Sequence, residues 1–201
     1  ALRREVLGPA AAAAGNPFPV ITGTSAGAIN AAALATQADR FDAAVESLAQ
    51  VWLQFSAEQV YRADSLGVIR SGAQWLTMLS IGWVLARWRR ARPRSLLDNE
   101  PLAGLLKRLV PLDRIAELCR HGHLRALAVT ASSYTSGEHV TFYQAQPAVE
   151  PWVRSQRLAV PAPVTLDHLL ASSAIPFVFP AQLLAPPGGD PGWYGDGSMR
   201  N

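Results

Sequence analysis

A serine flanked by glycines, at a point where a strand is expected to turn into a helix, constrains this sequence more than any other feature. The segment reads Gly23-Thr24-Ser25-Ala26-Gly27, a G-x-S-x-G pattern. Residues 20–22 are β-branched, which favours a strand, and residues 26–38 are rich in alanine, which favours a helix. Glycines at both ends leave room for a tight turn and a close helix–strand crossing. Ser25 is therefore predicted to project from a sharp turn. The alternative is an ordinary Ser/Gly turn before a helix.

Length and composition fit a single domain over residues 1–201. The net charge of +3 is too small and too dispersed to indicate a nucleic-acid partner. Cys119 is the sole cysteine, and the close pair His121 and His123 has no second ligand cluster, so we expect no internal disulfide, no metal site and no cofactor. The first residues do not form a basic-then-apolar leader, so we expect a cytoplasmic protein that can meet a membrane peripherally.

Interleaved helix and strand signals predict an α/β fold. Helical spacing marks residues 41–55, 96–110 and 165–174, and strand patterns mark residues 124–131 and 139–143. A connection rich in proline and glycine then leads Tyr194 into the turn Gly195-Asp196-Gly197. Residues 1–7 begin inside an expected helix and Asn201 directly follows a turn, so we expect the domain to be truncated at both ends.

Residues 72–94 are expected to form an apolar and basic insertion or arm within this domain. The apolar side chains cover most of a helix circumference and arginines follow them, but the apolar run is shorter than the roughly 20 residues that a membrane span needs. Such a helix either lies in a lipid interface or is buried against protein, and both interpretations stay open. In the first case the lipid-interface residues are Trp75, Leu79, Trp83, Trp88, Arg87, Arg89 and Arg90.

Two arrangements of residues would activate Ser25 as a nucleophile. A conventional triad would use His168 with Asp113 or Asp167, in the chain order serine, acid, histidine. His168, however, lies near the start of an expected helix, where a capping or surface role is more common. Asp196 instead stands between two glycines at the end of an apolar strand. Its carboxylate would accept the proton of Ser25 directly and return it to the leaving group.

These segments together resemble the patatin-like phospholipases. Residues 23–30 look like the nucleophile elbow of that family, and Asp196-Gly197-Ser198 looks like its Asp-Gly-Gly/Ala dyad motif. Four further segments are similar to family segments and follow in the same order: residues 95–102, 127–131, 135–138 and 168–176. The resemblance therefore covers most of the chain.

The resemblance implies a modified α/β-hydrolase fold of three layers, with a central, mainly parallel sheet flanked by helices. It also implies a serine lipid acyl hydrolase of the phospholipase A or lysophospholipase type, with Ser25 as nucleophile, Asp196 as base and no catalytic histidine. The backbone N–H of Ala26 would be one oxyanion donor. The substrates would be phospholipids or other fatty-acyl esters met at a membrane surface, and no calcium ion is implied.

Two departures from the family pattern qualify this interpretation. The glycine-rich oxyanion loop of the family, G-G-G-x-R/K-G, is not found before Ser25, and it would precede Ala1 if residues 1–7 are the end of the first helix. Ser198 replaces the usual glycine or alanine and is expected to crowd the dyad turn. A conventional triad esterase and a non-catalytic lipid-binding or scaffold protein of the same fold are the alternative functions.

Overall fold

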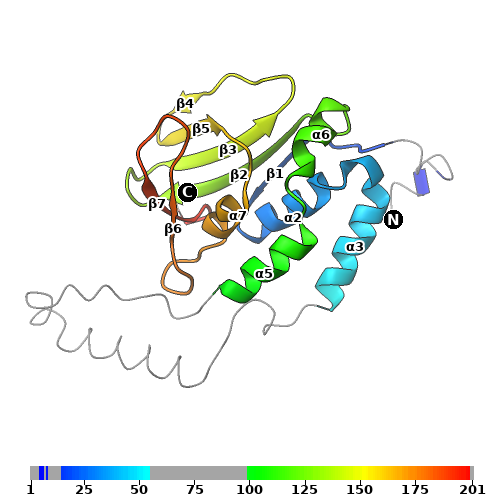
Figure 1. Cartoon of the computed structure of the whole chain (residues 1–201), viewed down its shortest axis with the longest axis horizontal. Coiled ribbons are helices and arrows are strands. Elements are labelled where there is room, and N and C mark those ends of the chain that lie inside the picture. The colour runs from blue at the N-terminus through cyan, green and yellow to red at the C-terminus, as the bar shows by residue number, and fades with distance from the viewer. Residues whose placement is uncertain (1–4, 7, 9–14, 55–98, 200–201) are drawn as a thin grey trace, which may run out of the picture.

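The computed structural model describes residues 5, 6, 8, 15–54 and 99–199, and this part of the chain contains both helices and strands (Figure 1). The expected arm at 72–94, with all its lipid-interface candidates, lies outside the described residues, as does most of the expected helix at 1–7. The described elements are β1 (Val20–Thr24), α2 (Ala26–Ala35), the 3-10 turn η2 (Ala38–Arg40), α3 (Phe41–Leu53), α5 (Glu100–Leu109), α6 (Arg114–Arg120), β2 (Ala126–Ser133), β3 (His139–Ala145), β4 (Val153–Arg154), β5 (Arg157–Pro161), α7 (Leu166–Ser172), β6 (Gln182–Leu184) and β7 (Gly192–Asp196).

The strands form one seven-stranded sheet in the order β4-β5-β3-β2-β7-β6, with β1 also paired to β2. β1 runs parallel to β2 along residues 126–130, whereas β7 runs antiparallel to β2 along residues 131–133. The two strands therefore lie end to end on the same side of β2 and run toward each other. Their last residues, Thr24 and Asp196, pair with the adjacent residues Thr130 and Ala131. This topology brings Ser25, the residue after β1, to the end of β7.

The sheet is mixed. Four of the six pairings among the described strands are antiparallel, namely β2–β3, β2–β7, β4–β5 and β6–β7. Only β1–β2 and β3–β5 are parallel within this part of the chain. The expected predominance of parallel pairing was therefore wrong. The physical reason is that short connections join β2 to β3, β4 to β5 and β6 to β7, and a short connection permits only antiparallel pairing.

The main core lies between the helices and one face of the sheet. Alternation along β2 directs Leu127 and Val129 to this face, where both are fully buried. α2 meets them with Ala28 and Ala32, whose small side chains let the helix pack close to the strands. Helices α5, α6 and α7 add larger apolar groups to the same cluster: Leu102, Leu106, Ile115, Leu118, Leu169 and Leu170. α2 is thus packed firmly beneath the turn that carries Ser25.

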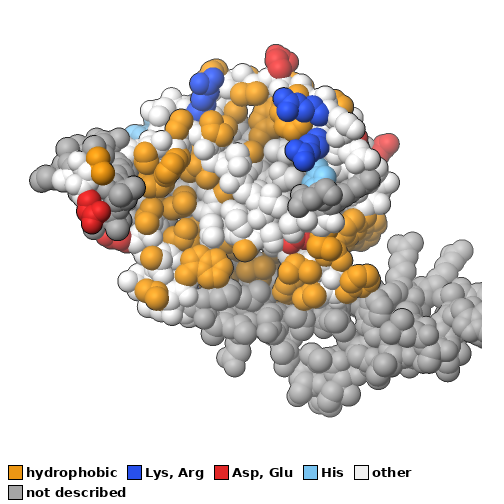
Figure 2. Space-filling model, turned by 180° about the vertical axis from the view of Figure 1, so that it is seen from behind, with side chains coloured by type: hydrophobic (Ala, Val, Ile, Leu, Met, Phe, Trp, Pro, Cys, Tyr) orange, Lys and Arg blue, Asp and Glu red, His pale blue; other side chains and the backbone are white. Residues whose placement is uncertain are grey.

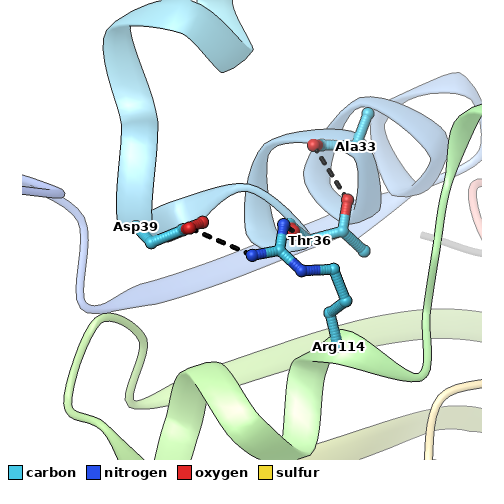
Figure 3. Close-up of polar contacts among 4 residues, drawn as sticks. All are labelled: Ala33, Thr36, Asp39 and Arg114. Carbon is cyan, nitrogen blue, oxygen red and sulfur yellow. Dashed lines mark hydrogen bonds and ion pairs between the residues drawn. The ribbon is translucent and has the colours of Figure 1, made fainter.

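Arg114, the first residue of α6, binds the C-terminal end of α2 (Figure 3). Its guanidinium donates to the carbonyl oxygen of Thr36 at 2.7 Å and to Asp39 Oδ2 at 3.0 Å. Thr36 Oγ1 donates in turn to the carbonyl oxygen of Ala33 at 3.1 Å. A cation at this end of a helix satisfies carbonyl groups that lack intrahelical partners and interacts favourably with the helix dipole. The C-terminal end of α2 is therefore tied to α6.

The opposite face of the sheet buries less. Its cluster consists of Ala128, Tyr143 and Ala159. Elsewhere in the described part, large apolar side chains remain exposed, such as Phe18 at 56% and Val153 at 74%. Apolar groups are spread over much of the side of the molecule seen in Figure 2. Most of the described core therefore belongs to the helix-covered face.

Candidate active site

Ser25 occupies a backbone conformation that few residues other than glycine adopt. It lies between the last residue of β1 and the first residue of α2, with φ 56° and ψ −133°. A positive φ at a residue with a Cβ costs about 1–3 kcal/mol and is found where surrounding contacts enforce it. The backbone N–H of Ser25 donates to Ser172 Oγ at 2.9 Å. The turn therefore holds Ser25 in a strained position between β1 and α2.

Asp196 lies at the end of β7 with its carboxylate directed at Ser25. The side chain is 1% exposed, and Oδ2 accepts a hydrogen bond from Ser25 Oγ at 2.6 Å. The other oxygen, Oδ1, accepts from the backbone N–H and from the hydroxyl of Ser198, at 2.8 and 2.6 Å. A buried carboxylate requires such partners. Because Ser198 occupies Oδ1, the carboxylate presents Oδ2 to Ser25.

Ser198 thus has a contact that the sequence did not predict. We expected its side chain to crowd the dyad turn, but the hydroxyl is instead bonded to Asp196. Of the two glycines that flank Asp196, Gly197 is sterically required, because a Cβ there would overlap the backbone carbonyl group of Thr130. A Cβ at Gly195 would overlap the hydroxyl end of the Tyr134 side chain, which can rotate away. The turn is therefore tight at Gly197 and open at Ser198.

The two glycines of the G-x-S-x-G pattern are not equivalent. A Cβ on Gly23 would overlap the backbone of Gly27 and Ala28, so β1 and α2 can cross this closely only with glycine at 23. A Cβ on Gly27 would meet nothing within 4 Å. The expectation that both glycines relieve a close crossing was therefore wrong for Gly27, because this residue lies on the exposed side of the first helical turn.

The remaining elbow residues, Thr24 and Ala26, contact the dyad turn and the cavity respectively. The Thr24 methyl group lies beside Gly197, 2.8 Å from where a Cβ there would stand. Ala26 is the first residue of α2, and the first N–H groups of a helix have no intrahelical partner. The N–H of Ala26 is therefore suited to bind an oxygen atom held beside Ser25.

Ser25 opens into an apolar cavity of about 950 Å³. Its walls come from α2, α3, α5 and the segment that follows α7. Apolar side chains predominate, and Arg108 is the one ionisable residue among the described ones that line it. The other lining residues are Ala26, Ile29, Asn30, Ala33, Gln37, Ala44, Ser47, Leu48, Val51, Trp52, Leu102, Leu105, Leu106, Leu109, Val110, Ser173, Ile175, Val178 and Phe179.

The cavity follows the whole length of α2. Ala26 lines it beside Ser25, and Gln37 lines it beyond the other end of the helix. At a rise of 1.5 Å per residue, this stretch spans roughly 16 Å. A long, apolar cavity that begins at a serine hydroxyl matches an unbranched hydrocarbon chain attached to a reacting ester.

His168 lies apart from this site and caps α7. Its Nδ1 accepts from the backbone N–H of Thr165 at 3.0 Å and lies 2.9 Å from the Thr165 hydroxyl. The ring packs against Phe142 with centroids 4.3 Å apart and is 8% exposed. Burial lowers the pKa of this histidine below its ordinary value, although the charge of Asp167 acts in the opposite direction. These contacts fit the capping role and argue against a triad through His168.

The described residues offer neither a metal site nor a membrane span. No group of three His, Cys, Asp or Glu side chains is placed there to hold a metal ion. Nor does that part of the chain contain a helix with the length and apolar character to span a membrane.

The comparison with protein families shows which family the chain belongs to. A family model described as patatin-like phospholipase matches residues 1–201. The chain belongs to the patatin-like phospholipase family. The expected patatin-like α/β fold is thereby confirmed, and membership implies lipid acyl hydrolase activity on lipid esters. No curated protein matches the chain.

Sequence reasoning missed the contacts that other elements make with this patatin-like site. Ser172 lies in the segment 168–176 that resembled the family, but no local pattern shows that its hydroxyl reaches Ser25. The same holds for the hydrogen bond from Trp52 Nε1 to Asn30 Oδ1, at 3.0 Å, which joins two cavity walls. Contacts between residues far apart in the sequence leave no periodic signal.

Proposed function

We propose that this protein hydrolyses fatty-acyl esters, with phospholipids and lysophospholipids as the substrate class, through a dyad of Ser25 and Asp196. The observation that carries the proposal is the 2.6 Å hydrogen bond between Ser25 Oγ and Asp196 Oδ2 at one end of a long apolar cavity. The hydroxyl is thus next to its base, and the cavity offers a place for the acyl chain of the ester.

In the first half of the reaction, Ser25 Oγ attacks the carbonyl carbon of the ester while its proton passes to Asp196 Oδ2. The negative charge that develops on the carbonyl oxygen is stabilised by the N–H of Ala26. The bond to the leaving alcohol then breaks, and Asp196 returns the proton to the departing oxygen. The product of this half-reaction is an acyl ester on Ser25.

In the second half, Asp196 Oδ2 accepts a proton from a water molecule, whose oxygen attacks the acyl carbon. The bond between that carbon and Ser25 Oγ breaks, Ser25 recovers a proton from Asp196, and the fatty acid leaves. Asp196 can act as the base in both steps, so a second base is not required. Ser198 holds Asp196 Oδ1 by two hydrogen bonds, which leaves Oδ2 for the proton transfers. We place the reaction at a membrane surface, since its substrates are held in bilayers.

The cavity predicts how activity depends on chain length. Ala33 lies two helical turns beyond Ser25 on the cavity wall. Replacing it by phenylalanine should obstruct the distal part, so hydrolysis of long-chain phospholipids should fall at least tenfold while a short soluble ester is cleaved at nearly the normal rate. Ala43→Phe is the matched control, since Ala43 is exposed on α3 and does not line the cavity. Equal losses on long and short esters would contradict this use of the cavity.

The chemistry is tested with phospholipid vesicles and a short soluble ester as parallel substrates. Ser25→Ala and Asp196→Asn should each abolish or greatly reduce hydrolysis of both. Asp190→Asn makes the same chemical change as Asp196→Asn at an exposed loop residue and should have no effect. Substantial hydrolysis by Ser25→Ala would overturn the proposed nucleophile.

A further inference from the structure

We propose that Ser172 is a positioning residue that fixes the strained turn at Ser25 and aligns it with Asp196. The inference rests on the proposed function, because it concerns the alignment of the same two residues. It does not make Ser172 a catalytic residue, since its contacts are with the protein backbone and with the nucleophile's own N–H.

The Ser172 hydroxyl forms a bridge between the turn and β2. It is fully buried, accepts from the N–H of Ser25 at 2.9 Å and donates to the carbonyl oxygen of Thr130 at 2.6 Å. A hydroxyl has a single proton, so donation to Thr130 leaves a lone pair for the N–H of Ser25. Thr130 is the register partner of Thr24. The bridge therefore anchors the turn to the sheet at the level where β1 ends.

This bridge acts on the dihedral angle that is strained. φ of Ser25 describes rotation about the bond between its N and Cα atoms. Ser172 holds the N–H on one side of that bond, and α2, which begins at the next residue, holds the other side. The Ser172 hydroxyl is therefore the restraint that acts directly on the N–H side of the φ angle of 56°. Without that hydroxyl, the packing of α2 and the hydrogen bond from Ser25 Oγ to Asp196 are left to oppose relaxation toward the ordinary negative region.

The same short segment also holds the base. The N–H of Asp196 donates to the carbonyl oxygen of Ala174 at 2.9 Å, and the N–H of Gly197 donates to the carbonyl oxygen of Ser172 at 3.3 Å. Residues 172–174 thus contact Ser25 through a side chain and Asp196 through the backbone. Truncating Ser172 to alanine removes only the first of these contacts, so it should displace the nucleophile relative to a base that stays in place.

The expected result is a loss in the chemical steps rather than in binding. Displacement of a reacting atom by about 1 Å can cost on the order of 100-fold in rate. Ser172→Ala should therefore lower kcat by roughly 10- to 100-fold with KM unchanged, and should slow the labelling of Ser25 by a fluorophosphonate probe to a similar extent. Ser172→Cys keeps the size and a weaker hydrogen-bonding group, so its rates should fall between those of the parent and alanine proteins.

The matched control is Ser133→Ala. Ser133 is also a buried serine. It lies at the end of β2, where its hydroxyl accepts from the N–H of Ser136 at 3.1 Å and has a side-chain hydrogen bond with Tyr194. It should lose thermal stability without losing labelling rate when each protein is assayed well below its Tm. If Ser172→Ala does not fold, the labelling rate of Ser172→Cys is compared with that of Ser133→Ala instead.

The outcomes separate this inference from the proposed function. If Ser25→Ala is inactive and the Ser172 variants label as fast as Ser133→Ala, Ser172 only packs the core and the inference is overturned. If Ser25→Ala remains active, the proposed nucleophile itself is wrong. A raised KM with an unchanged kcat in Ser172→Ala would also contradict a positioning role, because it would place the effect in substrate binding.

Discussion

The two glycines of the serine motif should respond in opposite directions to the same substitution. In Gly23→Ala the new Cβ would overlap backbone atoms of Gly27 and Ala28, which cannot rotate away as a side chain would. Overpacking of this kind costs about 1–3 kcal/mol. In Gly27→Ala the Cβ meets nothing within 4 Å. Because alanine loses less entropy than glycine on entering a helix, that substitution should stabilise the protein by up to about 1 kcal/mol.

For a domain of 150–250 residues, each kcal/mol shifts the Tm by roughly 2–4 °C. Gly23→Ala should therefore lower the Tm by roughly 2–12 °C, and Gly27→Ala should raise it by up to about 4 °C. Thermal unfolding followed by circular dichroism measures both. Fluorophosphonate labelling should slow markedly in Gly23→Ala, where the turn that carries Ser25 is displaced, and should be retained in Gly27→Ala. Similar destabilisation by the two substitutions would refute the packing argument.

Two further predictions concern His168 and Ser198. The lowered pKa of buried His168 means that the unfolded chain binds a proton more readily, so stability should be fully present above about pH 6.5 and should decline as the pH falls below it. His168→Gln keeps a capping acceptor without a titrating group, so its Tm should vary less between pH 7 and pH 5, whereas an unchanged slope would contradict the assignment. Ser198→Ala removes one of two hydrogen bonds to Asp196 Oδ1, so kcat should fall about three- to tenfold with little change in Tm. Full activity of Ser198→Ala would show that the backbone N–H suffices.

The sequence predicted those parts of the fold that depend on local pattern. The turn around Ser25, with a strand before it and a helix after it, was predicted because β-branched and alanine-rich runs adjoin it directly. The expected helices at 41–55 and 165–174 correspond to α3 and α7, with ends that differ by a few residues. β4 and β6 were not predicted, since strands of two and three residues are too short to show a periodic pattern.

The candidate site was predicted only as far as single residues. Ser25 and Asp196 were named from their motifs and from a family resemblance, but their meeting depends on β1 and β7 lying end to end along β2. Gly23 and Gly27 occupy equivalent positions in the G-x-S-x-G pattern of the sequence. Only the packing shows that a Cβ on Gly23 would meet backbone atoms, whereas a Cβ on Gly27 would enter open space. Ser172 reaches Ser25 across 147 residues, so its role required the fold.

The most direct test of the account is to locate the reactive serine and measure how far it depends on Asp196. The full chain is treated with a fluorophosphonate, the labelled peptide is identified by mass spectrometry, and the labelling rate is compared among the parent protein, Asp196→Asn and Asp190→Asn. We predict that the label is on Ser25, that Asp196→Asn slows labelling by about 100-fold or more, and that Asp190→Asn leaves the rate unchanged. Label on another serine, or equal rates for the parent protein and Asp196→Asn, would contradict this prediction.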